Sequence, residues 1–160
     1  NVHEYLTRRY DALMKFVQNG GNFIVQYNTS NNIGPIKAKM SPFNLNIGRT
    51  RVTDEASPVR FALPDHPALN FPNKITQKDF EGWIQERSIY HGGQYDSTAF
   101  ATPLALKDFG ENEELGSLLI APYGKGNFVY TGLVFFRELP AAVPGAYRLM
   151  ANLIGLPQNK

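Results

Sequence analysis

Residues 116–156 read GSLLIAPYGKGNFVYTGLVFFRELPAAVPGAYRLMANLIGL, and this stretch decides the fold class. Its apolar runs predict a strand at Ser117–Ala121 and a second strand at Phe128–Phe136. The turn Tyr123–Gly126 between them carries two glycines, which permit the positive φ angles of a tight hairpin. The second strand leads into the charged pair Arg137–Glu138. Because ligands usually bind where the strands of an open α/β sheet end, this corner is a candidate site.

Helices are predicted near both ends of the chain. Residues 3–19 place apolar side chains at helical spacing, and Gly20-Gly21 then supplies a helix stop. The apolar run Phe23–Tyr27 follows, typical of a strand buried on both faces, and residues 144–156 predict a last helix. The buried face predicted for that last helix consists of Tyr147, Met150, Ala151 and Ile154. This order predicts a mixed α/β sheet with flanking helices and a late antiparallel hairpin.

The middle of the chain has a weaker pattern. Residues 28–41 are polar and rich in Asn, Gly and Lys, which predicts a long loop after the first strand. Five prolines follow between residues 42 and 77, so irregular structure is expected there apart from a strand at Val59–Leu63. The remaining predictions are a turn at Asp65–Pro67 capped by Asp65, a short helix at Asp79–Gln85 capped by Thr76, strands at Ser88–Tyr90 and Ala99–Leu106, and a surface turn at 107–115.

Length and composition exclude several classes of protein. The 160 residues predict a single domain, 1–160, and a formal net charge of +2 gives no basis for nucleic-acid binding. No apolar stretch approaches the ~20 residues that span a bilayer. Cysteine is absent, and His3, His66 and His91 lack the spacing of metal ligands, so no disulfide, metal site or cofactor is predicted. Asn1 is not a natural start, which predicts a fragment of a longer protein.

Several stretches of the chain resemble known families. The first helix, Gly20-Gly21 and Phe23-Ile24-Val25 resemble the corresponding segment of class I glutamine amidotransferase-like domains, a group that includes ThuA-like proteins. A closer resemblance is to the accessory domain that follows LmbE/PIG-L-type zinc deacetylase domains in some bacterial proteins. That resemblance rests on the stretches Ile24–Thr29, Arg51–Glu55, Asp65–Pro67, Pro72–Thr76, Gly82–Arg87 and Phe135–Pro140.

The resemblance implies a flavodoxin-like, amidotransferase-like sheet that lacks its opening strands in this chain. Such a sheet exposes one edge, which needs cover from another chain or from the absent strands. The resemblance also implies a non-catalytic accessory or interaction domain of a PIG-L/LmbE-type deacetylase, in a periplasmic or secreted bacterial protein. The expected partners are the deacetylase domain, the absent strands, a second copy of the chain, or a carbohydrate.

The residues needed for amidotransfer are missing. Active members of the amidotransferase group use a cysteine nucleophile, a histidine base and a glutamate that orients the base. In the matching stretch, Arg137 stands at the histidine position and Leu139 stands at the glutamate position. Arginine stays protonated near neutral pH and cannot act as a general base. Amidotransfer by this mechanism is therefore excluded, and no catalytic residue is predicted.

Charged and aromatic residues in the remaining stretches make up a predicted ligand site. They are Arg51, Asp54, Glu55, Trp83, Gln85, Glu86, Arg87, Arg137 and Glu138. In the functional interpretation, the tryptophan ring stacks on a sugar while the polar groups bind its hydroxyls. In the structural interpretation, the tryptophan is half-buried and ion pairs fix a long loop to the core. Both interpretations stay open.

An enzyme that acts on a sugar or glycoconjugate is the rival hypothesis. Such an enzyme needs two carboxylates about 5 to 10 Å apart across a cleft, for which Asp54, Glu55, Glu86 and Glu138 are the candidates. If the predicted residues converge on one pocket, binding or catalysis is favoured. If they scatter or pair with one another, an interaction domain is favoured.

Overall fold

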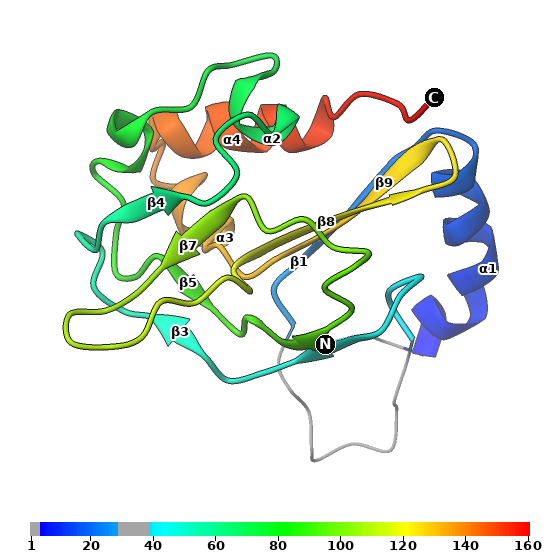
Figure 1. The fold of residues 1–160 in the computed structure, drawn as a ribbon, viewed down its shortest axis with the longest axis horizontal. Helices are drawn as coiled ribbons and strands as arrows, with labels where there is room; N and C mark the ends of the chain where they lie inside the picture. Colours follow the sequence, from blue (N-terminus) through cyan, green and yellow to red (C-terminus); the bar gives the residue numbers. More distant parts are fainter. Residues whose placement is uncertain (1–3, 29–38) are drawn as a thin grey trace.

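The computed structural model describes residues 4–28 and 39–160. It is a mixed α/β structure with a three-stranded sheet in the order β1-β9-β8 (Figure 1). The strands are β1 (Asn22–Gln26), β9 (Gly126–Thr131), which is parallel to β1, and β8 (Leu118–Tyr123), which is antiparallel to β9. Most of the loop predicted at residues 28–41 lies outside the described residues, and so do Asn1 and His3.

Two longer helices cover the sheet, α1 (Glu4–Gln18) on one face and α4 (Pro144–Ile154) on the other. The alternation of side chains along β9 places neighbouring residues in different hydrophobic clusters. Phe128 belongs to the cluster under α1, and the next residue, Val129, belongs to the cluster under α4. No helix in residues 4–28 or 39–160 is both long and apolar enough to cross a membrane.

The middle of the chain adds short elements around this sheet. Two-stranded antiparallel sheets are formed by β2 (Leu45–Ile47) with β6 (Gly92–Tyr95), β3 (Arg51–Val52) with β5 (Ser88–Ile89), and β4 (Val59–Phe61) with β7 (Leu104–Leu106). Shorter helical segments are α2 (Pro67–Asn70), the 3-10 helix η1 (Gln77–Phe80) and α3 (Phe135–Glu138). α2 and η1 both pack against α4. These segments position most of the predicted site residues.

The predictions for the two ends of the chain are confirmed in outline. The helix predicted at 3–19 is α1, the strand predicted at 23–27 is β1, and the hairpin consists of β8 and β9. The strand predicted at Phe128–Phe136 is too long, since β9 ends at Thr131. There the Thr131 hydroxyl accepts a hydrogen bond from the Leu133 amide at 3.1 Å, and the chain turns into α3. Arg137 therefore lies on a helical turn rather than at a strand end.

The predicted buried face of α4 is confirmed only at Met150, which packs half-buried against the core, and is otherwise wrong by about one position. The side chains that face the core are Ala146, Leu149, Asn152 and Leu153. Tyr147 and Ile154, which were predicted to be buried, are 51% and 64% exposed. Asn152 explains the error, because it is a polar residue that is fully buried: its amide donates to the Ala68 carbonyl at 2.9 Å. A hydrophobic pattern assigns such a residue to the solvent side.

Three predictions for the middle of the chain need correction. The helix predicted at Asp79–Gln85 is the shorter η1, followed by Gly82 at φ +70°, a conformation that no helix continues. The predicted cap is present, since the Asp79 carboxylate accepts from the Thr76 amide at 2.7 Å. The strand predicted at Ala99–Leu106 is confined to β7. In the turn at Asp65–Pro67, His66 is the cap rather than Asp65: its Nδ1 accepts from the Ala68 amide at 3.1 Å.

Gly145→Ala is expected to lower the free energy of unfolding by about 1 to 3 kcal/mol. A Cβ at this position would come within 1.8 Å of the Asp79 carbonyl oxygen, so α4 would have to move away from η1. Alanine is ordinarily preferred over glycine inside a helix. The loss of stability expected here is therefore opposite to the change that helix propensity alone predicts. Urea denaturation measures the change, with Gly155→Ala as control, where the nearest atom is 3.2 Å away. Equal losses in both variants would contradict the close contact of α4 with η1.

Candidate functional site

The corner formed by α3 and the segment before β5 is held together by Arg137. Its Nε lies 3.1 Å from Glu86 Oε1 in an ion pair, and its Nη1 donates to the Gln85 side-chain oxygen. Gln85 has a φ of +66°, which is uncommon for a residue with a side chain. Three of the nine predicted site residues, Gln85, Glu86 and Arg137, therefore lie together here, but they bind one another. Arg137 is left about one-third exposed.

Glu138 faces the interior of the same corner. It is fully buried, and its two carboxylate oxygens accept from the Ile84 amide at 3.1 and 3.2 Å. Burial raises the pKa of Glu138, while the Ile84 amide and the charge of Arg87 act in the opposite direction. Glu138 and Arg137 thus clamp the segment 84–86 onto α3 from two sides.

An aromatic stack that was not predicted joins this corner to the end of β1. The ring of Tyr27 lies 5.5 Å from Tyr90 and 4.9 Å from Phe136, with both pairs stacked. The Arg137 guanidinium lies 5.0 Å from the centre of the Phe136 ring. Tyr90 has a φ of +53°, another uncommon backbone conformation. These three rings come from segments far apart in the sequence and share no local pattern, so only the fold reveals this contact.

Arg87 and Trp83 face away from the corner and into the core. Trp83 is 3% exposed, and its indole nitrogen donates to the Asp79 carbonyl at 2.9 Å. Arg87 is 5% exposed; its Nε donates to the Ser57 carbonyl at 3.1 Å and its Nη1 donates to the Phe80 carbonyl. Burial lowers the pKa of the guanidinium, and nearby carboxylates oppose that effect. Most of each side chain is therefore occupied by internal contacts.

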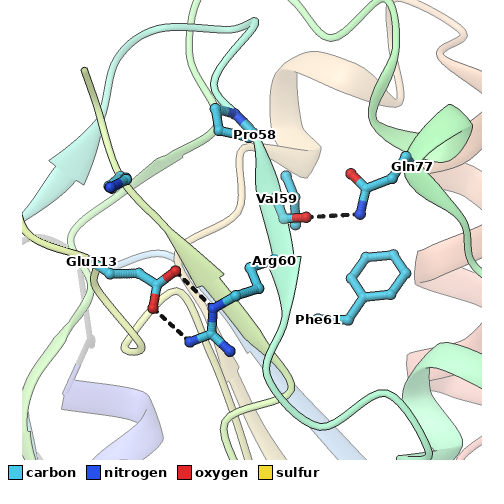
Figure 2. A pocket seen from close by; sticks show the side chains of 7 residues that line it. Pro58, Val59, Arg60, Phe61, Gln77 and Glu113 are labelled. Carbon is cyan, nitrogen blue, oxygen red and sulfur yellow. Dashed lines mark hydrogen bonds and ion pairs between the residues drawn. The ribbon is translucent and has the colours of Figure 1, made fainter. Parts of the chain in front are cut away.

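Two adjoining cavities open beside β4. The larger, of about 510 Å³, is lined by three of the predicted residues, Glu55, Trp83 and Arg87, together with Glu81 and other residues of the η1 region. The smaller, of about 380 Å³, is lined by both faces of β4 and by charged residues (Figure 2). Figure 2 shows Arg60 paired with Glu113 on one side of β4 and Gln77 on the other. The Arg60 Nε donates to Glu113 Oε1 at 2.8 Å.

Asp54 and Arg51 lie outside both the corner and the cavities. The Asp54 carboxylate accepts from the Ala56 amide at 2.8 Å, and its own amide donates to Asp108 at 2.9 Å. Asp108 was not predicted, yet it also binds the amide and the hydroxyl of Thr53, each at 2.8 Å. Burial opposes ionisation of Asp108, but these hydrogen bonds outweigh it and lower its pKa. Arg51 is exposed on β3.

Ser88 and His91 form a buried pair that was not predicted either. Ser88 Oγ lies 2.6 Å from His91 Nε2, and the two residues are at most 1% exposed. His91 Nδ1 makes no hydrogen bond to any described residue. Burial lowers the pKa of His91 to about 4. A serine–imidazole contact of this kind suits a nucleophile and its base, but both side chains are buried and no described residue holds Nδ1 as the third member of a triad would.

The nine predicted residues therefore divide into separate groups. Gln85, Glu86, Arg137 and Glu138 form the corner, Glu55, Trp83 and Arg87 line the larger cavity, and Arg51 and Asp54 belong to neither. Among the residues that the structure describes, no group of three or more His, Cys, Asp or Glu side chains could hold a metal ion. The corner carboxylates are bound by internal partners rather than facing a cleft.

The outer edge of β1 is the other conspicuous surface. Within the described parts of the chain, β1 pairs with β9 and with no other strand. The Gly21 carbonyl accepts from the Asn127 amide at 3.3 Å, and this bond determines which alternate residues of β1 hydrogen-bond to β9. Phe23 and Val25 consequently direct their backbone groups to β9, and the alternate residues, Ile24 among them, direct theirs to the open edge.

Exposed apolar side chains flank this edge on both faces. Phe16 of α1 is 54% exposed, and a Cβ on Gly21 would come within 2.2 Å of its ring. Ile154 of α4 is 64% exposed, and its carbonyl accepts from the Asn22 side chain at 3.0 Å. The Phe16 ring and the backbone of Ile154 thus lie beside the start of β1.

Comparison with known proteins gives no assignment. No protein-family model matches the chain, and no curated protein matches it.

Proposed function

We propose that this chain is a non-catalytic accessory domain of a PIG-L/LmbE-type deacetylase, and that it docks on its partner through the open edge of β1. In this proposal the sheet is flavodoxin-like, and a strand of the deacetylase polypeptide completes it beside β1. The sequence resemblance supplies the family. The observation that carries the docking is the outer edge of β1, which no strand within residues 4–28 and 39–160 pairs with.

The composition of β1 supports an interior position. Its residues NFIVQ contain no charge and no proline, and its apolar side chains point to both faces of the sheet. Phe23 and Val25 pack with the cluster under α1, and Ile24 packs with the cluster under α4. Parallel strands covered on both faces have this composition, whereas natural edge strands are usually protected by lysine, proline or a bulge. β1 therefore has the sequence of a central strand and the position of an edge strand.

The flanking helices support the same occupant. A strand that pairs with β1 would satisfy the outward amide and carbonyl of Ile24 and would bring its own side chains beneath Phe16 and Ile154. Backbone hydrogen bonds give such strand addition its affinity, and alternate side chains give its specificity. An extended segment with apolar residues on both faces fits this surface, because the exposed residues on its two sides, Phe16 and Ile154, are apolar.

The use of the polar residues supports a non-catalytic role. Arg137 and Leu139 stand where the resembled enzymes have a base and its orienting glutamate, and cysteine is absent from the whole sequence. Arg137 is bound to Glu86, and the Glu138 carboxylate is bound to a backbone amide. A general acid or base must reach its substrate, and these groups are occupied by the protein itself.

Phe16→Glu and Ile154→Glu are each expected to weaken binding to a PIG-L/LmbE-type deacetylase domain at least tenfold, because a carboxylate would be buried beside the docked strand. Isothermal titration calorimetry with the separately expressed deacetylase domain measures the affinity. Both positions are more than half exposed, so the variants should keep the fold.

Phe109→Glu is the matched control for these two variants. Phe109 is fully exposed in the surface turn 107–115, so the same change in charge occurs away from β1. Its affinity should equal that of the unmodified chain. If Phe16→Glu and Ile154→Glu bind as tightly as Phe109→Glu does, docking through the β1 edge is wrong.

A further inference from the structure

The larger cavity beside β4 contains a buried cation with an unused donor. Arg87 lines this cavity and is 5% exposed. Its Nε and Nη1 are bound to the carbonyls of Ser57 and Phe80, but Nη2 has no hydrogen-bond partner among the described residues. A guanidinium carries five N–H donors, so the donors of Nη2 remain for a bound molecule or for water.

The rim of the cavity supplies acceptors. Glu55 and Glu81 line it, both are exposed, and neither side chain makes a hydrogen bond to a described residue. Gln77 uses its amide nitrogen to donate to the Val59 carbonyl at 2.8 Å, which leaves its side-chain oxygen unbound. The cavity thus places acceptors at its rim and a donor at its buried end.

Aromatic side chains supply the apolar part of the lining. Phe80 and Trp83 line the cavity, with their ring centres 5.5 Å apart, and the guanidinium of Arg87 lies 5.8 Å from the Trp83 ring. A volume of about 510 Å³ lies within the range of small-molecule sites, which combine apolar walls with a few fixed polar groups.

The distribution of charge restricts the class of ligand. Two carboxylates at the rim oppose an anion, and the buried guanidinium opposes a cation at the inner end. A molecule with several neutral hydroxyl groups meets both requirements, since each hydroxyl can accept from Arg87 and donate to Glu55 or Glu81. We propose that this cavity binds a neutral monosaccharide or a similar polyol. It shares no lining residue with the edge of β1, so the proposal does not depend on the docking function.

Trp83 makes the proposal directly measurable, because it is the single tryptophan of the chain and it lines the cavity. Tryptophan fluorescence and calorimetry are followed while D-glucose or N-acetyl-D-glucosamine is added to the full chain. D-glucuronate serves as the anionic probe. We expect saturable binding of at least one neutral sugar, with weaker or no binding of D-glucuronate.

Glu55→Ala is expected to weaken sugar binding about tenfold, because hydrogen bonds to a carboxylate are lost. This variant is preferred to a change of Arg87, which is buried and whose replacement is expected to destabilise the fold. Glu111→Ala is the control, an exposed glutamate in the turn 107–115 that does not line the cavity. The proposal is overturned if neither neutral sugar gives a saturable signal by either method. Equal affinity of the two variants, or tighter binding of D-glucuronate, would also overturn it.

Discussion

Arg87→Leu is expected to lower the free energy of unfolding by about 3 to 5 kcal/mol, a large part of the stability of a domain of this size. Leucine would leave the carbonyls of Ser57 and Phe80 without the donors that they have in the native structure. Each buried group left unsatisfied costs about 1 to 3 kcal/mol. The stacking of the guanidinium on Phe80 and Trp83, at 5.9 and 5.8 Å, is lost as well.

Urea denaturation followed by circular dichroism measures this change. Arg51→Leu is the matched control, because Arg51 is exposed on β3 and should change stability by less than about 0.5 kcal/mol. If Arg87→Leu lowers the free energy of unfolding by less than about 1 kcal/mol, the guanidinium is a surface group and does not hold the Ser57 and Phe80 carbonyls in the interior.

Acidification is expected to destabilise the chain through His91. Burial lowers the pKa of this residue to about 4, from an ordinary value of 6.5. The unfolded chain therefore binds the His91 proton between these pH values while the folded chain does not. The contribution of His91 is fully present above about pH 6.5, falls as the pH decreases, and levels off below about pH 4. At about 1.4 kcal/mol for each pH unit, the total loss is about 3.5 kcal/mol.

His91→Gln is expected to remove this dependence while keeping a polar group near Ser88. Free energies of unfolding are compared between pH 7.5 and pH 4, and the difference between wild type and variant isolates the histidine from the carboxylates. His66→Gln is the control: it removes the α2 cap and shifts the whole curve, but it should leave most of the slope. An unchanged slope in His91→Gln would contradict the buried neutral state of His91.

The three strands of the central sheet could be predicted from the sequence because they depend on local patterns. The apolar runs and glycine turns that predicted β1, β8 and β9 are confirmed, since period and turn chemistry act over a few residues. The face of α4 was missed because Asn152 is buried through hydrogen bonds to distant backbone groups, including the Asn73 carbonyl at 2.7 Å. Hydrogen bonds between residues far apart in the sequence leave no periodic signal.

In the candidate site, too, some features could be predicted from the sequence and others depend on contacts between distant residues. Residue type placed Arg137, Glu86 and Gln85 among the candidate site residues, but it did not indicate that Arg137 would pair with the other two. It could not indicate the direction in which each side chain points. Glu86 and Arg87 are neighbours, yet one faces α3 and the other faces β4, since successive residues in extended backbone point to opposite sides. The Tyr27 stack required the fold itself.

Hydrogen exchange at single amides of β1 tests the docking proposal most directly. The Ile24 amide points to the open edge, whereas the amides of Phe23 and Val25 are bonded to β9. In the free chain we expect fast exchange at Ile24 and slow exchange at its two neighbours. When a PIG-L/LmbE-type deacetylase domain is added, exchange at Ile24 should slow by more than about tenfold as a strand pairs with β1. If Ile24 exchanges equally fast with and without that domain, the edge of β1 is not the docking surface.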